Sequence, residues 1–156
     1  MKNVRSFMLA TVTCLLCSVT LAAQTVTVRV RVTYLKNGEP AKHQQVTLYA
    51  GDVSRASIPR LDGTTSSAGV ALFHLRKPLP KTVSVGVENG RIRACASWAG
   101  SPLDEVLKRG VTIGVDKEFG SACKGDRGLN KRLAAKPGEI VIFVRKLTWW
   151  DNLKEY

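Results

Sequence analysis

Histidine and cysteine are scarce in this chain of 156 residues, which contains two His and four Cys. His43 follows a turn-forming segment, and His74 lies in an alternating stretch that would point its side chain to solvent. Neither histidine has cysteine or histidine neighbours at the spacing that zinc sites use. The sequence therefore predicts no metal site.

Catalytic motifs are also absent. No Gly-x-Ser-x-Gly elbow precedes a predicted helix, so a serine hydrolase of that kind is unsupported. Residues 124–128 contain glycine but are too few and too charged for a phosphate-binding loop. Asp116 and Glu118 have no third acid or histidine nearby to complete a site. We therefore expect a protein that is not an enzyme and that holds no cofactor.

One long apolar stretch is present, and it lies at the N-terminus. Lys2 and Arg5 precede it, it runs from Phe7 to Leu21, and small residues follow. A basic head, a short apolar centre and small residues at the end are typical of a secretory signal peptide. The stretch is short for a membrane span, which needs ~20 apolar residues. We therefore predict a signal peptide over residues 1–23.

Removal of this peptide implies an exported protein, periplasmic or extracellular, without a transmembrane segment. The alternatives are an uncleaved anchor and lipid attachment at Cys14 or Cys17, although each cysteine follows a residue larger than lipidation sites usually have. The remaining residues, 24–156, are enough for one domain. No repeat or linker divides them.

Two cysteines, Cys95 and Cys123, remain in the mature chain. Export permits disulfides, and only one pairing is possible within the chain. We predict a Cys95–Cys123 disulfide, which should stabilise the fold by ~3 to 4 kcal/mol by closing a loop. A metal site is the alternative, but no histidine lies close to either cysteine in the sequence.

Alternation of apolar and polar residues predicts β-strands. Residues 25–34 place valine at every second position with threonine or arginine between, the period of a strand with one buried face. Further strands are predicted over 45–49, 70–75, 82–88, 91–98 and 139–146, the last apolar enough to be central. A turn is predicted over 36–40, and loops over 50–67, with a short edge strand near Ile58, and over 111–138.

Two local signals refine this pattern. Asn89-Gly90 predicts a hairpin with a two-residue turn, because both residues accept positive φ. That register sets Val87 opposite Ile92. It puts Cys95 on the opposite face of the hairpin from Val83, Val85 and Val87. One short helix is predicted after Ser101, which we expect to cap it, and Gly110 is expected to end it.

These elements predict a mainly β fold: an antiparallel two-sheet sandwich with one short helix and one disulfide. The segments V-R-V-R-V-T-Y, N-G-E-P-A, Q-Q-V-T-L-Y, T-T-S-S-A-G-V-A-L-F-H-L and V-S-V-G-V resemble the carboxypeptidase regulatory-like domains. Those domains share a transthyretin-like (prealbumin-like) sandwich and are near to bacterial Ig-like modules. The resemblance covers residues 26–88. It implies a non-catalytic accessory or adhesion role and brings no catalytic residues.

Basic residues outnumber acidic ones, with 24 Lys and Arg against 12 Asp and Glu and a net charge of +12. Such a charge favours an acidic partner, with solubility alone as the alternative. Nucleic acid is disfavoured, because the sequence has no recognised nucleic-acid motif and an exported protein seldom meets nucleic acid. The expected partner is an anionic polymer of the cell envelope or an extracytoplasmic protein.

Two groups of residues are candidates for binding such a partner. The aromatic group is Trp98, Trp149 and Trp150, whose flat rings suit sugar faces and protein interfaces unless they cover the bottom of the core. The basic group is Arg29 and Arg31 on the first strand, with Lys124, Arg127, Lys131, Arg132 and Lys136 in the late loop. An ordinary solvated surface is the alternative for the basic group.

Together these features predict an exported, non-catalytic β-sandwich module that binds a cell-envelope glycan or an extracytoplasmic protein. The alternative is a structural or assembly subunit of an envelope complex. A small exported hydrolase ranks third.

Overall fold

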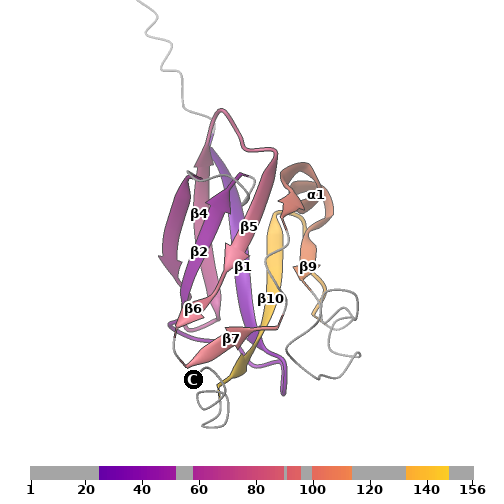
Figure 1. The fold of residues 1–156 in the computed structure, drawn as a ribbon. Coiled ribbons are helices and arrows are strands. Elements are labelled where there is room, and N and C mark those ends of the chain that lie inside the picture. Colours follow the sequence, from indigo (N-terminus) through magenta and orange to yellow (C-terminus); the bar gives the residue numbers. More distant parts are fainter. Residues whose placement is uncertain (1–24, 52–57, 90, 96–99, 114–132, 148–156) are drawn as a thin grey trace, which may run out of the picture.

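A computed structural model describes residues 25–51, 58–89, 91–95, 100–113 and 133–147, and the predicted signal peptide lies outside them. The described chain forms two β-sheets and one short helix (Figure 1), which confirms the predicted mainly β class. The elements are β1 (Thr25–Tyr34), β2 (Gln45–Ala50), β3 (Arg60–Thr64), β4 (Val70–Arg76), β5 (Thr82–Gly86), β6 (Glu88–Asn89), β7 (Ile92–Ala94), β8 (Ser101–Pro102), α1 (Leu103–Arg109), β9 (Val111–Ile113) and β10 (Glu139–Lys146).

The first sheet, sheet A, has the strand order β4-β1-β10-β7-β6, and β9 also pairs with β10. The second, sheet B, has the order β3-β2-β5-β8. The two sheets face each other, and α1 lies beside β10 (Figure 1). We call the side of each sheet that faces the other sheet its inner side.

The prediction of purely antiparallel sheets is wrong for sheet A. β1 pairs with β4 antiparallel but with β10 parallel, in a register that sets Val30 beside Ile140. β9 also pairs with β10 in parallel. Alternating residues show which face of a strand is buried but not the direction of its neighbour, so the sequence pattern could not distinguish the two arrangements.

β1 confirms the alternation predicted for it. Val28, Val30 and Val32 are fully buried on the inner side of sheet A, whereas Thr27 and Arg29 point outward and are exposed. The core between the sheets consists of residues from both of them. Its buried members are Val28, Val30, Val32, Ala41, Val46, Leu48, Ala71, Phe73, Leu75, Val83, Val85, Val87, Ile92, Leu103, Val106, Ile140, Ile142 and Val144.

β10 is buried on both faces, as its apolar sequence predicted. Ile140, Ile142 and Val144 belong to the core between the sheets. On the outer side, Val141 and Phe143 form a second cluster with Leu35 and Cys95, against which Leu133 and Ala135 pack. The segment just before β10 therefore covers the outer side of sheet A. A strand flanked on both edges and covered on both faces needs apolar residues at successive positions.

The hairpin signal at Asn89-Gly90 marks the correct region but the wrong register. Asn89 pairs with Ile92, and not Val87 as predicted. The strand predicted over 82–88 is also divided: β5 pairs in sheet B, whereas β6 belongs to sheet A. The predicted and observed partners of Ile92 differ by two residues, so each side chain keeps its face. Val87 and Ile92 lie in the core, and Cys95 lies in the outer cluster, as expected.

Helix α1 forms where it was predicted, but Ser101 does not cap it. Ser101 pairs with Val83 as part of β8, and the N-cap position is Pro102, without a side-chain cap hydrogen bond. The first turn contains acidic residues and the last turn basic ones, which suits the helix dipole. Gly110 ends the helix with φ 76°, ψ 163°, a conformation open essentially to glycine alone.

Two short strands lie within the segments predicted as loops, and one of them is close to the edge strand predicted near Ile58. β3 pairs with β2 and begins two residues after Ile58, close to the predicted edge strand. β9 lies in a segment predicted as a loop, and that prediction is wrong for Val111–Ile113. Three residues are too few to show a two-residue period, so β9 depends on its pairing with β10.

The segment just before β10, which covers the outer side of sheet A, is attached to the sheet by an ion pair. Arg31 Nη2 lies 3.0 Å from Glu139 Oε2, and these side chains are 24% and 6% exposed. Arg31 Nη2 also donates to the Ala134 carbonyl at 3.2 Å. Glu139 Oε2 accepts a hydrogen bond from the Lys136 N–H at 3.0 Å. The pair therefore joins β1, β10 and the segment that covers them.

Replacing Glu139 tests this attachment. Glu139→Gln removes the charge that neutralises the half-buried Arg31, so we expect the free energy of unfolding to fall by about 2 to 4 kcal/mol. Urea denaturation of the mature protein measures the loss. Glu105→Gln is the matched control, because Glu105 also pairs with an arginine but on the solvated surface of α1. Equal losses in the two variants would contradict this role for Glu139.

Candidate functional site

Most of the residues predicted to bind a partner lie outside the described part of the chain, and so does one of the two disulfide cysteines. The residues concerned are Trp98, Cys123, Lys124, Arg127, Lys131, Arg132, Trp149 and Trp150. The prediction that they bind a ligand, and the prediction of a Cys95–Cys123 disulfide, stay predictions.

Arg29 and Arg31 are described, and they differ. Both project from the outer side of β1. Arg31 is held by Glu139 and the Ala134 carbonyl, so its charge is already neutralised within the fold. Arg29 is exposed, and its strand neighbours are Leu72 on β4 and Glu139 on β10. Of the two predicted arginines, Arg29 is the one that solvent and a ligand reach.

A pocket of about 480 Å³ opens at the end of the sandwich where β1 and β10 both terminate. We call it the basal pocket. It is formed by the end of β1, the turn that follows, and the end of β10. Its described lining is Tyr34, Lys36, Asn37, Glu39, Val144, Arg145 and Lys146. The volume is within the range of small-molecule sites, about 300 to 1,000 Å³.

The turn that lines the basal pocket lies within residues 36–40, where the sequence predicts a turn. Gly38 adopts φ 74°, and its N–H donates to the Tyr34 carbonyl at 2.9 Å. The Tyr34 N–H donates to the Glu39 carbonyl at 2.8 Å, and Asn37 Oδ1 accepts the Glu39 N–H at 3.2 Å. These bonds set Lys36, Asn37 and Glu39 around the end of β1.

The turn after β1 forms one wall of the basal pocket, and the end of β10, which pairs with β1, forms another. The Leu35 N–H donates to the Val144 carbonyl at 2.9 Å, which holds the two strand ends together. Val144 is buried and Tyr34 is half-buried against the core, so the floor of the basal pocket is apolar. Lys146 Nζ lies 5.4 Å from the centroid of the Tyr34 ring, within the range of a cation–π contact.

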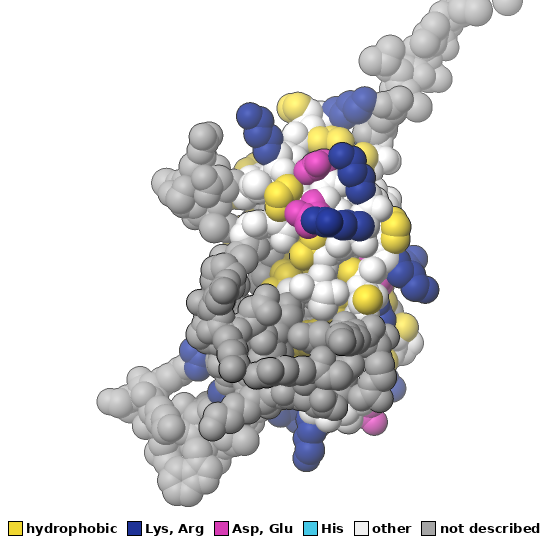
Figure 2. Space-filling view, turned by 90° about the vertical axis from the view of Figure 1, so that its right-hand side faces the viewer, with side chains coloured by type: hydrophobic (Ala, Val, Ile, Leu, Met, Phe, Trp, Pro, Cys, Tyr) yellow, Lys and Arg dark blue, Asp and Glu magenta, His cyan; other side chains and the backbone are white. Residues whose placement is uncertain are grey.

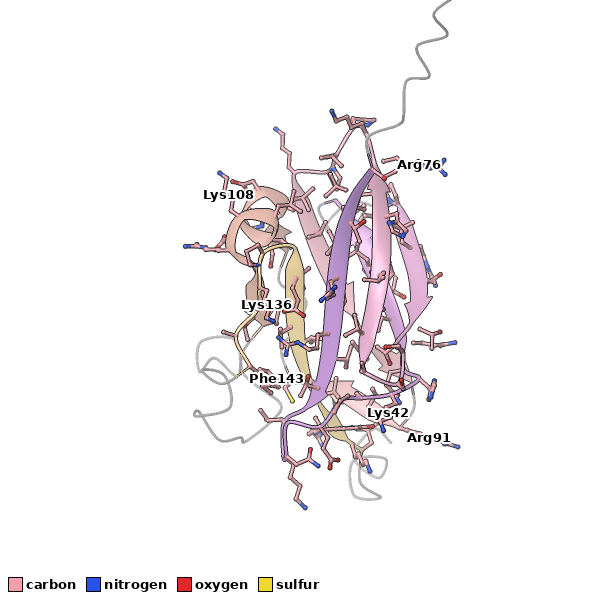
Figure 3. All side chains as sticks on the ribbon, turned by 180° about the vertical axis from the view of Figure 1, so that it is seen from behind. Lys42, Arg76, Arg91, Lys108, Lys136 and Phe143 are labelled. Atoms are coloured by element: carbon pink, nitrogen blue, oxygen red, sulfur yellow. The ribbon has the colours of Figure 1, made fainter. Side chains whose placement is uncertain are left out.

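Basic residues predominate in the described lining of the basal pocket, which contains Lys36, Arg145 and Lys146 and one acid, Glu39. More basic residues lie close by. Arg93 is directly opposite Arg145 in the sheet, and the Arg91 carbonyl accepts the Leu147 N–H. Figure 3 shows Arg91 and Lys42 at this end of the molecule and Arg76 at the other end. A concave surface with this charge raises the local concentration of anions.

On α1 and β3, by contrast, basic residues are paired with acids. On α1, Asp104 pairs with Lys108 at 3.5 Å and Glu105 pairs with Arg109. Figure 2 shows acidic and basic side chains side by side on the face that includes this helix. On β3, Arg60 pairs with Asp62 at 3.0 Å. These pairs neutralise much of the local charge.

Metal-binding clusters, histidines and membrane-spanning helices are other features by which the described residues could indicate a function. Within them, no group of three or more His, Cys, Asp or Glu side chains is placed to hold a metal ion. His74 is exposed, with Nδ1 3.0 Å from Thr27 Oγ1, and His43 is exposed in a turn. No helix in this part of the chain has the length and hydropathy of a membrane span.

The pKa of Asp62 is lowered, chiefly by a hydrogen bond from Thr47 Oγ1 at 2.7 Å and then by hydrogen bonds from Arg60. Asp62 is exposed on the outer side of sheet B. Both partners stabilise its charged form, so this carboxylate is held ionised and is a poor proton donor.

Removing the Thr47 hydroxyl tests the cause of this shift. Thr47→Val should raise the pKa of Asp62 toward its ordinary value, which an NMR pH titration of the carboxyl carbon measures. A lowered folded pKa adds stability above the unfolded pKa, and this stability is lost as pH falls through the folded pKa. The variant should therefore lose less stability on acidification than the wild type. An unchanged pKa would show that Thr47 is not the main cause.

Compared with known proteins, the chain matches no family model, no curated protein and no solved structure.

Proposed function

We propose that this chain is an exported, non-catalytic β-sandwich module that binds an anionic polymer of the cell envelope through the basal pocket. The observation that carries the proposal is the convergence of Lys36, Arg145 and Lys146 on one pocket that has an apolar floor and, among its described lining residues, a single acid, Glu39. Without the predicted signal peptide, which carries Lys2 and Arg5, the chain has 22 Lys and Arg against 12 Asp and Glu, and this net charge of +10 supports an acidic partner.

The distribution of ion pairs also supports this site. Among the described residues, the carboxylates of Asp62, Asp104, Glu105 and Glu139 are each paired with a cation elsewhere on the fold. No described carboxylate forms an ion pair with Lys36 or Lys146. These two ammonium groups retain their capacity for an external anion.

A polymer is favoured over an isolated small anion because positive charge extends beyond the basal pocket. Arg91 and Lys42 lie at the same end of the sandwich (Figure 3), so a chain of negative charges that enters the pocket also passes other cations. Binding of this kind weakens as salt screens the attraction between the charges.

Export and the disulfide are parts of the same proposal. Cys95 is buried, and its N–H donates to the Phe143 carbonyl at 2.9 Å. Ile113 pairs with Ile142, the neighbouring position on the same edge of β10, and Leu133 packs against the cluster that contains Cys95. The segment between Ile113 and Leu133, which contains Cys123, thus begins and ends near Cys95. This connectivity favours the Cys95–Cys123 pairing.

The disulfide is tested in the mature protein purified from an oxidising compartment. We expect no free thiol in denaturant before reduction and two after it, and a Cys95–Cys123 peptide in the non-reduced digest. Cys123→Ser should lower the free energy of unfolding by about 3 kcal/mol, and chemical reduction of the wild type should have a similar effect. Two free thiols in the oxidised protein would refute the pairing.

Polymer binding is tested by sedimenting the mature protein with cell-envelope fractions at about 50 mM and about 500 mM salt. We expect binding at low salt and little at high salt. The variant Lys36→Gln/Lys146→Gln should bind less than the wild type at low salt. The control Arg76→Gln/Lys81→Gln makes the same change in charge toward the opposite end, where β1 begins, and should bind nearly as well as the wild type.

Each result decides a separate part of the proposal. Equal losses in the two double variants would show that general charge and not the basal pocket is responsible. Failure to bind any envelope fraction at either salt concentration would refute the polymer as partner.

That failure would favour the alternative function, a structural or assembly subunit. The observation that favours this alternative is the edge of strand β4. β4 pairs on one edge with β1 and has no second strand partner among the described residues. Leu72 on the outer side of β4 is 55% exposed and is the one large exposed hydrophobic residue in the part of the chain that is described. An open strand edge beside an exposed leucine suits the addition of a strand from another protein.

A further inference from the structure

We propose that the basal pocket recognises a sugar acid, a hydroxylated ring that carries a carboxylate, as the repeating unit of the bound polymer. This inference rests on the function proposed above and names the ligand of the same site. It follows from the kinds of hydrogen-bonding groups that the basal pocket brings together, from its floor, and from the rigidity of its walls.

The polar groups of the basal pocket require a ligand with both an anion and hydroxyl donors. Lys36 and Lys146 are donors only, and neither forms an ion pair with a described carboxylate. Ionised Glu39 is an acceptor only. Asn37 Oδ1 already accepts the Glu39 N–H, which leaves the Asn37 amide group as a further donor. A carboxylate satisfies the lysines, and ring hydroxyls satisfy Glu39.

This combination disfavours other anions. A polyanion without hydroxyl groups, such as polyphosphate, presents oxygens that accept hydrogen bonds, and it offers no donor to Glu39, whose charge repels it. A neutral sugar offers hydroxyls to Glu39 but no negative charge to Lys36 and Lys146. A sugar acid meets both demands, so the acid in the basal pocket is the residue that distinguishes the ligand classes.

The floor of the basal pocket suits a sugar ring. Tyr34 packs against the core and Val144 is buried, so both present apolar surface at the base of the pocket. Lys146 Nζ lies over the Tyr34 ring, 5.4 Å from its centroid. A carboxylate bound to Lys146 therefore lies next to this aromatic surface, where the C–H groups of the same sugar unit find an apolar contact.

The walls of the basal pocket are held by hydrogen bonds within the fold itself. Backbone hydrogen bonds join Gly38 to Tyr34, Tyr34 to Glu39, and Leu35 to Val144, at 2.8 to 2.9 Å. The turn and the end of β10 are therefore held together before binding. A rigid site loses less conformational entropy when it orders a ligand, which favours recognition of one chemical unit.

The test is isothermal titration calorimetry of the mature protein with three probes of similar length: oligogalacturonate, neutral galactose oligomers and inorganic polyphosphate. We expect oligogalacturonate to bind more tightly than either of the other probes. Lys36→Gln should weaken oligogalacturonate binding by about tenfold or more, the usual effect of losing a charged hydrogen bond. The matched control Lys81→Gln, an exposed lysine outside the pocket, should change it less than about twofold.

Glu39→Ala provides the sharpest comparison. Removing this charge reduces repulsion of both anionic probes, but only oligogalacturonate loses an acceptor for its hydroxyls. The ratio of its affinity to that of polyphosphate should therefore fall by about tenfold or more. Because Glu39 is exposed on a turn, circular dichroism should show an unchanged fold.

Three results would overturn the sugar acid as ligand: equal binding of galactose oligomers, tighter binding of polyphosphate, or an unchanged affinity ratio in Glu39→Ala. If oligogalacturonate fails while the protein still sediments with envelope fractions through the basal pocket, the sugar assignment alone is wrong. If both kinds of binding fail, the proposed function is wrong as well.

Discussion

The parallel pairing of β1 with β10 is the constraint on which the rest of the structure depends. It joins the first described strand to the last and runs from Arg29 beside Glu139 to Tyr34 beside Val144. β10 thereby occupies the middle of sheet A, with β1 on one edge and β9 and β7 on the other. A strand in this position is shielded from water on both faces only if further chain covers its outer side. The outer cluster around Phe143 provides that cover.

The two ends of this pairing serve different purposes. At the start of β10, Glu139 accepts hydrogen bonds from Arg31 and from the backbone of Lys136, so one carboxylate holds the cover against the sheet. At the other end, the turn after Tyr34 and the last residues of β10 line the basal pocket. Arg31 is thus neutralised at the start of β10, whereas Lys36 and Lys146 at its end form no ion pair with a described carboxylate.

This division explains why total charge is a poor guide to the site. Arg31 and Lys36 lie five residues apart in the sequence, yet Arg31 is neutralised inside the fold and Lys36 faces the basal pocket. The basic residues on α1 are likewise paired along the helix. What the basal pocket combines is a concave surface, an apolar floor, and two lysines, Lys36 and Lys146, that form no ion pair with a described carboxylate.

The sequence alone determined which faces are buried and where the chain turns, because side-chain alternation and turn residues act over a few positions. It therefore predicted the valines of β1, the buried β10, the turn at 36–40 and the helix before Gly110. Only the tertiary structure decided the parallel direction of β10, the passage of the chain from β5 in sheet B to β6 in sheet A, and the partner of Arg31. It also decided the basal pocket, whose Tyr34 and Lys146 come from opposite ends of the described chain. The direction of β10, the partner of Arg31 and the basal pocket depend on contacts between residues about a hundred positions apart. No local pattern specifies which distant strand pairs with a given strand, or in which direction.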